Sequence, residues 1–155
     1  MTDIGSEINI SGDLQELTCT KEDILELILL LIKVEPSLKK NLAKKSVNLS
    51  FVSTSEIEKL NLRFLNKNKP TNVLSFPALE SDLGDRSLGD IAICPEIIIN
   101  VALDQGKAAQ SHLSHIILHS LLHLAGHDHG DNDSADLMES LEVSVLEKLG
   151  IADPY

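Results

Sequence analysis

The chain has 155 residues, 43% of them hydrophobic and 24% charged, which is typical of a folded globular protein and excludes a disordered chain. A formal net charge of −11 argues against a protein that coats nucleic acid without specificity. With no Trp, one Tyr and three Phe, the core must be mainly aliphatic.

No stretch of the sequence is typical of a targeting or membrane-spanning segment. The first ten residues lack the basic and then apolar order of a secretory leader, and the longest apolar run, Ile24–Ile32, is too short to cross a bilayer. Cys19 and Cys94 form no CxxC pair, so we assign them no chemistry. We expect a single cytoplasmic domain over residues 1–155, with no membrane partner.

Residues 8–10 begin the predicted fold, because two isoleucines alternate there with polar neighbours in the manner of an edge strand. Thr20, with Asp23 three positions on, is typical of an N-cap and predicts a helix over residues 21–33. Residues 47–51 alternate apolar and polar side chains, which is the two-residue period of a half-buried strand.

A second helix is predicted to begin at a capping box formed by Ser55 and Glu58. Two consecutive strands are expected next, Thr71–Phe76 and Leu88–Cys94, joined by a turn-rich segment. The basic segment between Lys33 and Lys69 holds nine of the thirteen basic residues and three acids. Such a basic segment usually forms a solvated surface. This segment is also the one place in the sequence that could attract an RNA backbone.

Three helices are predicted in the last third of the chain. One runs from Pro95 to about Gln105 and one from Lys107 to about Ala125, each stopped by a glycine. The last, Ser134–Leu149, has an apolar stripe every four residues: Leu137, Leu141, Val145 and Leu149. Irregularly mixed strands and helices favour an α+β fold in which a small mixed sheet of about four strands packs with about five helices.

All six histidines lie between residues 112 and 129. His119 and His123 are four apart on a predicted helix and therefore project from the same face. Gly126 can end that helix in a left-handed conformation and let His129 approach from another direction. Three neutral imidazoles leave a fourth position of a zinc ion for water, as catalytic sites do. We predict a metal site at His119, His123 and His129.

Other residues near this motif allow alternatives. His115 shares the helical stripe, so a ligand set of His115, His119 and His123 is conceivable, although support of the ligands from a second layer suits His115 better. Asp128 is a candidate to orient a ligand or accept a proton, and a capping carboxylate is the competing interpretation. We keep His115 and Asp128 as candidate catalytic residues.

The spacing H-x3-H-x2-G-x2-H also matches metzincin peptidases, in which a Glu that acts as general base follows the first His. Here that position is Ser120. The metal motif is therefore present while the peptidase base is missing, which counts against a metallopeptidase-like hydrolase.

The motif HSLLHLAGHDH, together with LNLRFLNKNKPTNVLSFP at residues 60–77, LGDIAIC and LGIADPY, resembles the YbeY family of bacterial endoribonucleases. The resemblance covers nearly the whole chain from about residue 46. It implies a zincin-like fold, a zinc ion at the three histidines, and cleavage of single-stranded RNA in ribosomal RNA maturation and ribosome quality control. Small ribosomal subunit proteins are candidate partners, and a three-histidine site also accepts nickel.

One departure from the family pattern affects the expected RNA contact. The family has Arg, a substrate or phosphate contact, where this chain has Leu65. Arg63, Lys67 and Lys69 are the candidate replacements, the lysines as point charges rather than forked donors. We expect metal-assisted phosphodiester hydrolysis, and the missing Arg keeps a non-catalytic, metal-stabilised ribosome assembly factor open as the alternative.

Overall fold

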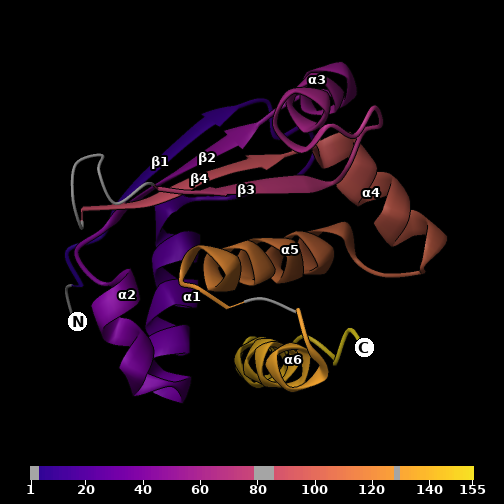
Figure 1. The fold of residues 1–155 in the computed structure, drawn as a ribbon. Helices are drawn as coiled ribbons and strands as arrows, with labels where there is room; N and C mark the ends of the chain where they lie inside the picture. Colours follow the sequence, from indigo (N-terminus) through magenta and orange to yellow (C-terminus); the bar gives the residue numbers. More distant parts are fainter. Residues whose placement is uncertain (1–3, 79–85, 128–129) are drawn as a thin grey trace.

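The computed structural model describes residues 4–78, 86–127 and 130–155. Figure 1 shows a twisted sheet with helices on both faces. The strands are β1 (Glu7–Gly12), β2 (Ser46–Phe51), β3 (Val73–Pro77) and β4 (Ser87–Ile93). The helices are α1 (Lys21–Val34), the 3₁₀ turn η1 (Pro36–Leu38), α2 (Lys39–Leu42), α3 (Thr54–Leu65), α4 (Pro95–Asp104), α5 (Ala109–Leu124) and α6 (Asn132–Lys148).

The sheet has the order β1-β2-β4-β3, in which β1, β2 and β4 are parallel and β3 runs antiparallel to β4. The predicted α+β class with a four-stranded mixed sheet is confirmed. The antiparallel pair is the pair of consecutive strands expected from the sequence. The turn-rich segment predicted between them falls mostly on residues 79–85, outside the described residues.

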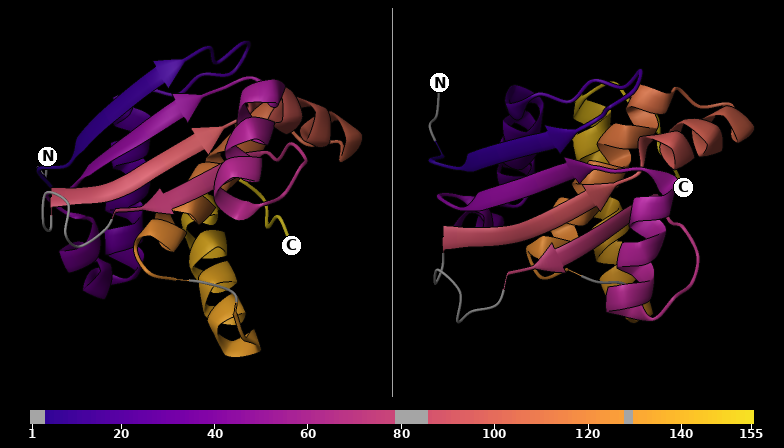
Figure 2. Two further views of the ribbon diagram at one scale, coloured as in Figure 1. Left: turned by 45° about the horizontal axis from the view of Figure 1, so that its top comes forward. Right: turned by 90° about the horizontal axis from the view of Figure 1, so that it is seen from above.

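The helices form two layers beneath one face of the sheet. Helices α1 and α5 pack against that face, and α6 lies on the far side of α5, while α3 covers part of the opposite face beside β3 (Figures 1 and 2). Helix α5 is therefore enclosed by the sheet and α6, and nine of its sixteen residues are buried. A helix that is apolar on most sides is expected in such a central position.

Three details of the sequence prediction need correction. The second capping box is formed by Ser53 and Glu56, so α3 begins earlier than a box at Ser55 and Glu58 would allow. Overlapping S-x-x-E patterns occur here, and the chain uses the first. Leu137 is 50% exposed, because the buried face of α6 is rotated toward Met138 and Glu142.

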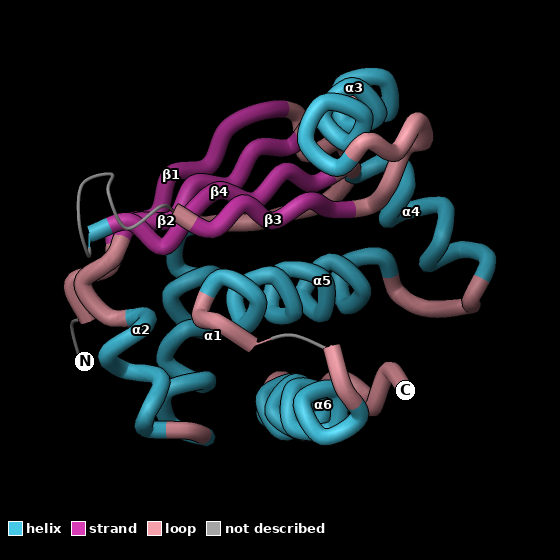
Figure 3. The backbone as a smooth tube through the Cα atoms, viewed as in Figure 1, coloured by secondary structure: helices cyan, strands magenta, loops and turns pink. Residues whose placement is uncertain are grey.

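Third, no helix was predicted for the segment between α1 and β2. It folds as η1 followed by the single-turn helix α2, which together carry the chain back to the start of the inner strand β2, as the tube in Figure 3 shows. Among the described residues, no helix combines the length and the apolar character needed to cross a membrane.

Candidate metal centre

Two histidines on α5 direct ring nitrogens toward each other. His119 Nε2 lies 3.2 Å from His123 Nε2, and the two ring planes are 80° apart. Two nitrogens bound at 2.0–2.1 Å to one tetrahedral zinc ion lie about 3.3 Å apart. The helix repeat and the orientations of the two rings together give this pair the separation of two ligands on one ion.

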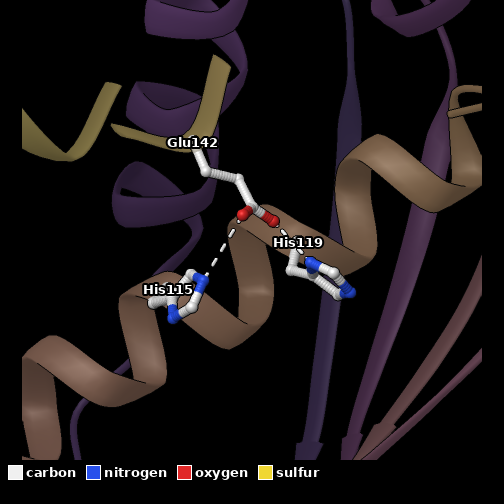
Figure 4. Close-up of side chains that lie close together, drawn as sticks. All are labelled: His115, His119 and Glu142. Carbon is white, nitrogen blue, oxygen red and sulfur yellow. Dashed lines mark hydrogen bonds and ion pairs between the residues drawn. The ribbon is translucent and has the colours of Figure 1, made fainter. Parts of the chain in front are cut away.

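The other nitrogen of His119 faces a buried carboxylate. Glu142 of α6 has no exposed surface, and its Oε1 is in direct hydrogen-bond contact with His119 Nδ1. Figure 4 shows this carboxylate reaching α5 between His115 and His119. A carboxylate that accepts from Nδ1–H fixes the tautomer of His119 that carries its lone pair on Nε2, which is the usual arrangement behind a histidine that binds a metal.

The second oxygen of Glu142 is held from outside α5. Oε2 accepts a hydrogen bond from the Tyr155 hydroxyl and lies 3.5 Å from His115 Nε2. His115 Nε2 also lies 3.2 Å from the Tyr155 hydroxyl oxygen. We call these four residues, His115, His119, Glu142 and Tyr155, the carboxylate network.

Glu142 is ionised within this network. Burial raises the pKa of its carboxyl, but hydrogen bonds from His115, His119 and Tyr155 outweigh that effect and bring the pKa down to about 2. A buried charge is tolerated when hydrogen bonds satisfy it in this way. His115, His119 and Glu142 also offer ligand atoms that all lie within 4.8 Å of one another, so this group could hold a metal ion.

His119 and His123 both line a cleft of about 250 Å³. Its walls come from α3, β3 and α5, and its lining residues are Leu65, Val73, Leu74, Ser75, His119, Ser120 and His123. Leu65 takes the position at which the family pattern has an Arg, and its apolar side chain is 52% exposed. Ser120 is fully buried and offers no carboxylate to act as a base.

The remaining predicted site residues are distributed differently. Asp128 and His129 lie outside the described residues, so their assigned roles stay predictions. Arg63, Lys67 and Lys69 are all exposed, at the end of α3 and in the loop after it. The Arg63 guanidinium carbon lies 5.2 Å from the centre of the Phe64 ring. None of these three residues lines the described cleft, whose wall from α3 is Leu65.

His112 is a core histidine. It is buried, and its pKa is lowered mainly by burial and to a lesser degree by the nearby His115 and Lys107. Glu142 and Tyr155 were missed by sequence reasoning. One signal pointed to Glu142: it lies four residues after Met138 and three before Val145, which puts a carboxylate on the apolar face of α6. No local pattern pointed to Tyr155.

Comparison with known proteins bears on what this centre does. The family model described as "Endoribonuclease YbeY" matches residues 8–150. A protein named Endoribonuclease YbeY from Francisella tularensis subsp. novicida is 44% identical over 122 residues, which cover 76% of this chain and 75% of that protein. Its counterpart from Francisella tularensis subsp. tularensis strain WY96-3418 is 43% identical, with the same coverage.

A solved structure also matches along nearly the whole chain. The solution structure of a Thermotoga maritima protein superposes with a TM-score of 0.53 at 29% sequence identity. The match covers 95% of this chain and 97% of the Thermotoga protein. The similarity therefore extends beyond the histidine motif to the arrangement of helices and strands.

Proposed function

The chain belongs to the endoribonuclease YbeY family, and from this premise we propose that it cleaves single-stranded RNA with a divalent metal ion held by α5. The proposed ligands are His119, His123 and His129, and zinc is the proposed ion. Ribosomal RNA is the proposed substrate and small ribosomal subunit proteins are proposed partners, in the cytoplasm. We treat residues 1–155 as one domain that carries this activity.

The observation that carries the proposal is the 3.2 Å separation of His119 Nε2 and His123 Nε2 at the wall of a cleft. The directions of the hydrogen bonds favour an ion at Nε2 of His119 over an ion within the group of His115, His119 and Glu142. Glu142 is ionised and only accepts, so His119 donates its Nδ1–H to Oε1. That nitrogen has no lone pair left for a metal ion, whereas Nε2 has one.

A divalent ion at this position supplies Lewis-acid chemistry, because it polarises a phosphate oxygen or lowers the pKa of a water molecule. The chain's own residues hold that geometry. Glu142 fixes the ring of His119, and the helix repeat places His123 beside it. Because His115 is engaged with Tyr155 and Glu142 on the opposite side of His119, we propose Asp128 as the proton acceptor.

Positive charge near the cleft supports an RNA substrate. Arg63, Lys67 and Lys69 are exposed on α3 and the loop after it, and α3 also supplies the cleft wall at Leu65. Exposed lysines and arginines attract phosphates without reading sequence. A single strand suits such a site better than a duplex, because its phosphates can be turned into a cleft.

Metal content and RNA cleavage test the proposal together. Protein purified without a histidine tag should carry about one zinc ion per chain by elemental mass spectrometry, as a site with three protein ligands retains. It should cleave a single-stranded RNA but not the same sequence in a duplex, and His119→Ala should lose both the metal and the cleavage. Stoichiometric metal with no cleavage of any RNA, but with association to ribosomal subunits, would favour the assembly factor instead. No bound metal together with unchanged cleavage would overturn the proposed site.

A further inference from the structure

The segment after α6 brings Tyr155 to His115 of α5 and Glu142 of α6. Gly150 takes a positive φ of 76°, and the Ile151 amide donates to the Leu146 carbonyl at 2.9 Å, which turns the chain back along α6. The Asp153 side chain then accepts from the Tyr155 amide at 2.8 Å. Tyr155 is 58% exposed, yet its hydroxyl reaches a carboxylate with no exposed surface.

The hydrogen bonds of the carboxylate network have one consistent direction. Tyr155 has a single hydroxyl proton, and it goes to Glu142 Oε2. The Tyr155 oxygen can then accept from His115 Nε2–H, at 3.2 Å. His119 Nδ1–H donates to Oε1, so the Tyr155 and His119 donors both end on this carboxylate, while His115 donates to Tyr155. The ring contact of His115 with Tyr155, at 5.5 Å between centres, holds the outer pair together.

From this arrangement we propose that Tyr155 is a positioning residue of the metal site, which with His115 holds Glu142 so that it orients His119 Nε2 toward His123. This inference rests on the proposed function, because it assigns a purpose to the orientation of a proposed ligand. Tyr155 touches neither His119 nor His123 in the described contacts, so it acts through Glu142. The segment after α6 thereby becomes part of the site.

Rotation of the carboxylate is what the hydroxyl prevents. Oε1 and Oε2 belong to one rigid group, so fixing Oε2 also fixes the direction in which Oε1 accepts from His119. Without the hydroxyl, His115 Nε2, at 3.5 Å, is the remaining described contact of Oε2. The carboxylate could then turn, and His119 could adopt the tautomer that carries its proton on Nε2. In that tautomer Nε2 has no lone pair with which to bind a cation.

Tyr155→Phe tests this, because it removes the hydroxyl and keeps the ring against His115. We expect zinc affinity, measured by competition with a chelator, to fall about tenfold, within the range for partners behind a metal ligand. Ser114→Ala is the matched control: it also removes a hydroxyl from the neighbourhood of His115, but Ser114 only donates to the Gln110 carbonyl of its own helix. The control should bind zinc as the unmodified protein does.

A second readout needs no metal and no RNA. In metal-free protein, ¹⁵N NMR of the imidazole rings should report the Nδ1–H tautomer for His119, and Tyr155→Phe should lower its population. A residue that merely stabilises the fold would lower the melting temperature and leave both the tautomer and the zinc affinity unchanged, and that result would overturn the inference. If the unmodified protein binds no zinc, the proposed function fails, while the tautomer still tests the role of Tyr155.

A double-mutant cycle shows whether Tyr155 acts through Glu142. Glu142→Gln should weaken zinc binding by about tenfold to a hundredfold. Adding Tyr155→Phe to that variant should change zinc affinity no further, since the carboxylate that the hydroxyl positions is already gone. Independent losses that multiply in the double variant would contradict positioning through Glu142.

Discussion

The two nitrogens of the His119 ring face two different environments. His119 Nε2 lies 3.2 Å from His123 Nε2, and both histidines line a cleft whose walls are mostly apolar. On the Nδ1 side lies the carboxylate network, in which the fully buried Glu142 accepts from Tyr155 and contacts His119. On the first side, both described histidines come from α5 and line a cleft that α3 and β3 complete, whereas the second side is closed and draws on α5, α6 and the segment after α6.

The number of ligand-type atoms on each side of His119 does not by itself indicate where an ion would bind. The Nδ1 side has more of them, because His115, His119 and Glu142 come within 4.8 Å of one another. Their lone pairs and protons are, however, used by one another, so an ion there would have to break these hydrogen bonds. Among the described residues the Nε2 side offers fewer ligand atoms, His119 Nε2 and His123 Nε2, but these two lie at the separation that a tetrahedral ion requires.

The largest expected effect is on zinc affinity, which should respond differently to substitutions on the two sides of His119. His123→Ala should weaken zinc binding by more than about a hundredfold, because it removes one of the two converging nitrogens. His115→Ala should weaken it by less than about tenfold, because His115 makes an edge contact with the His119 ring, at 6.3 Å between centres, and its described hydrogen bonds reach His119 through Tyr155 and Glu142. Titration of zinc against a chelator measures both variants. A larger loss for His115→Ala would place the ion in the group of His115, His119 and Glu142.

A smaller effect separates the two sides by stability without metal. Glu142→Leu should lower the free energy of unfolding of the metal-free protein by about 2 kcal/mol, because His119 Nδ1–H and the Tyr155 hydroxyl lose their buried acceptor. His123→Ala should change it by less than about 0.5 kcal/mol, as partly exposed positions usually do. Urea unfolding with a chelator present gives both values. Unchanged stability in Glu142→Leu would mean that the cost of burying the carboxylate cancels its hydrogen bonds.

The open side of His119 was largely predictable from the sequence, because it depends on local repeats. Spacing by four places His119 beside His123 on any helix, and Gly126 takes the positive φ of 104° that was expected where α5 ends. Strand β2 and the start of α4 were predictable for the same reason, since the alternation along residues 47–51 and the proline at position 95 are signals within a few residues.

The closed side was not predictable, because its contacts join residues far apart in the chain. Glu142 is 23 positions from His119, and Tyr155 is 40 positions from His115. In a helix with several acidic residues, no feature of residue type distinguishes a buried Glu from an exposed one. The rotation of α6 that buries Glu142 and exposes Leu137 is decided by packing against α5 and α1, which no single helix encodes.

The smallest expected effect tests whether RNA approaches from the cleft side. Leu65→Arg adds a cation to the cleft wall at the position where the family pattern has one, and Ala152→Arg adds the same charge to the exposed pocket beside His115. We expect Leu65→Arg to tighten binding of a single-stranded RNA about threefold and to steepen its salt dependence by about 0.7 in log–log slope, the value for one added phosphate contact. Fluorescence anisotropy at several salt concentrations measures both quantities.

The control variant makes this small effect interpretable. Both substitutions change the net charge of the protein by one unit, so a gain from long-range attraction would be equal in the two. A gain confined to Leu65→Arg would mean that the RNA backbone passes the Nε2 side of His119, within reach of the proposed ion. An equal gain in Ala152→Arg would mean that only long-range attraction to the protein's net charge changes RNA binding. That result would contradict a path for the RNA through the cleft beside His119 and His123.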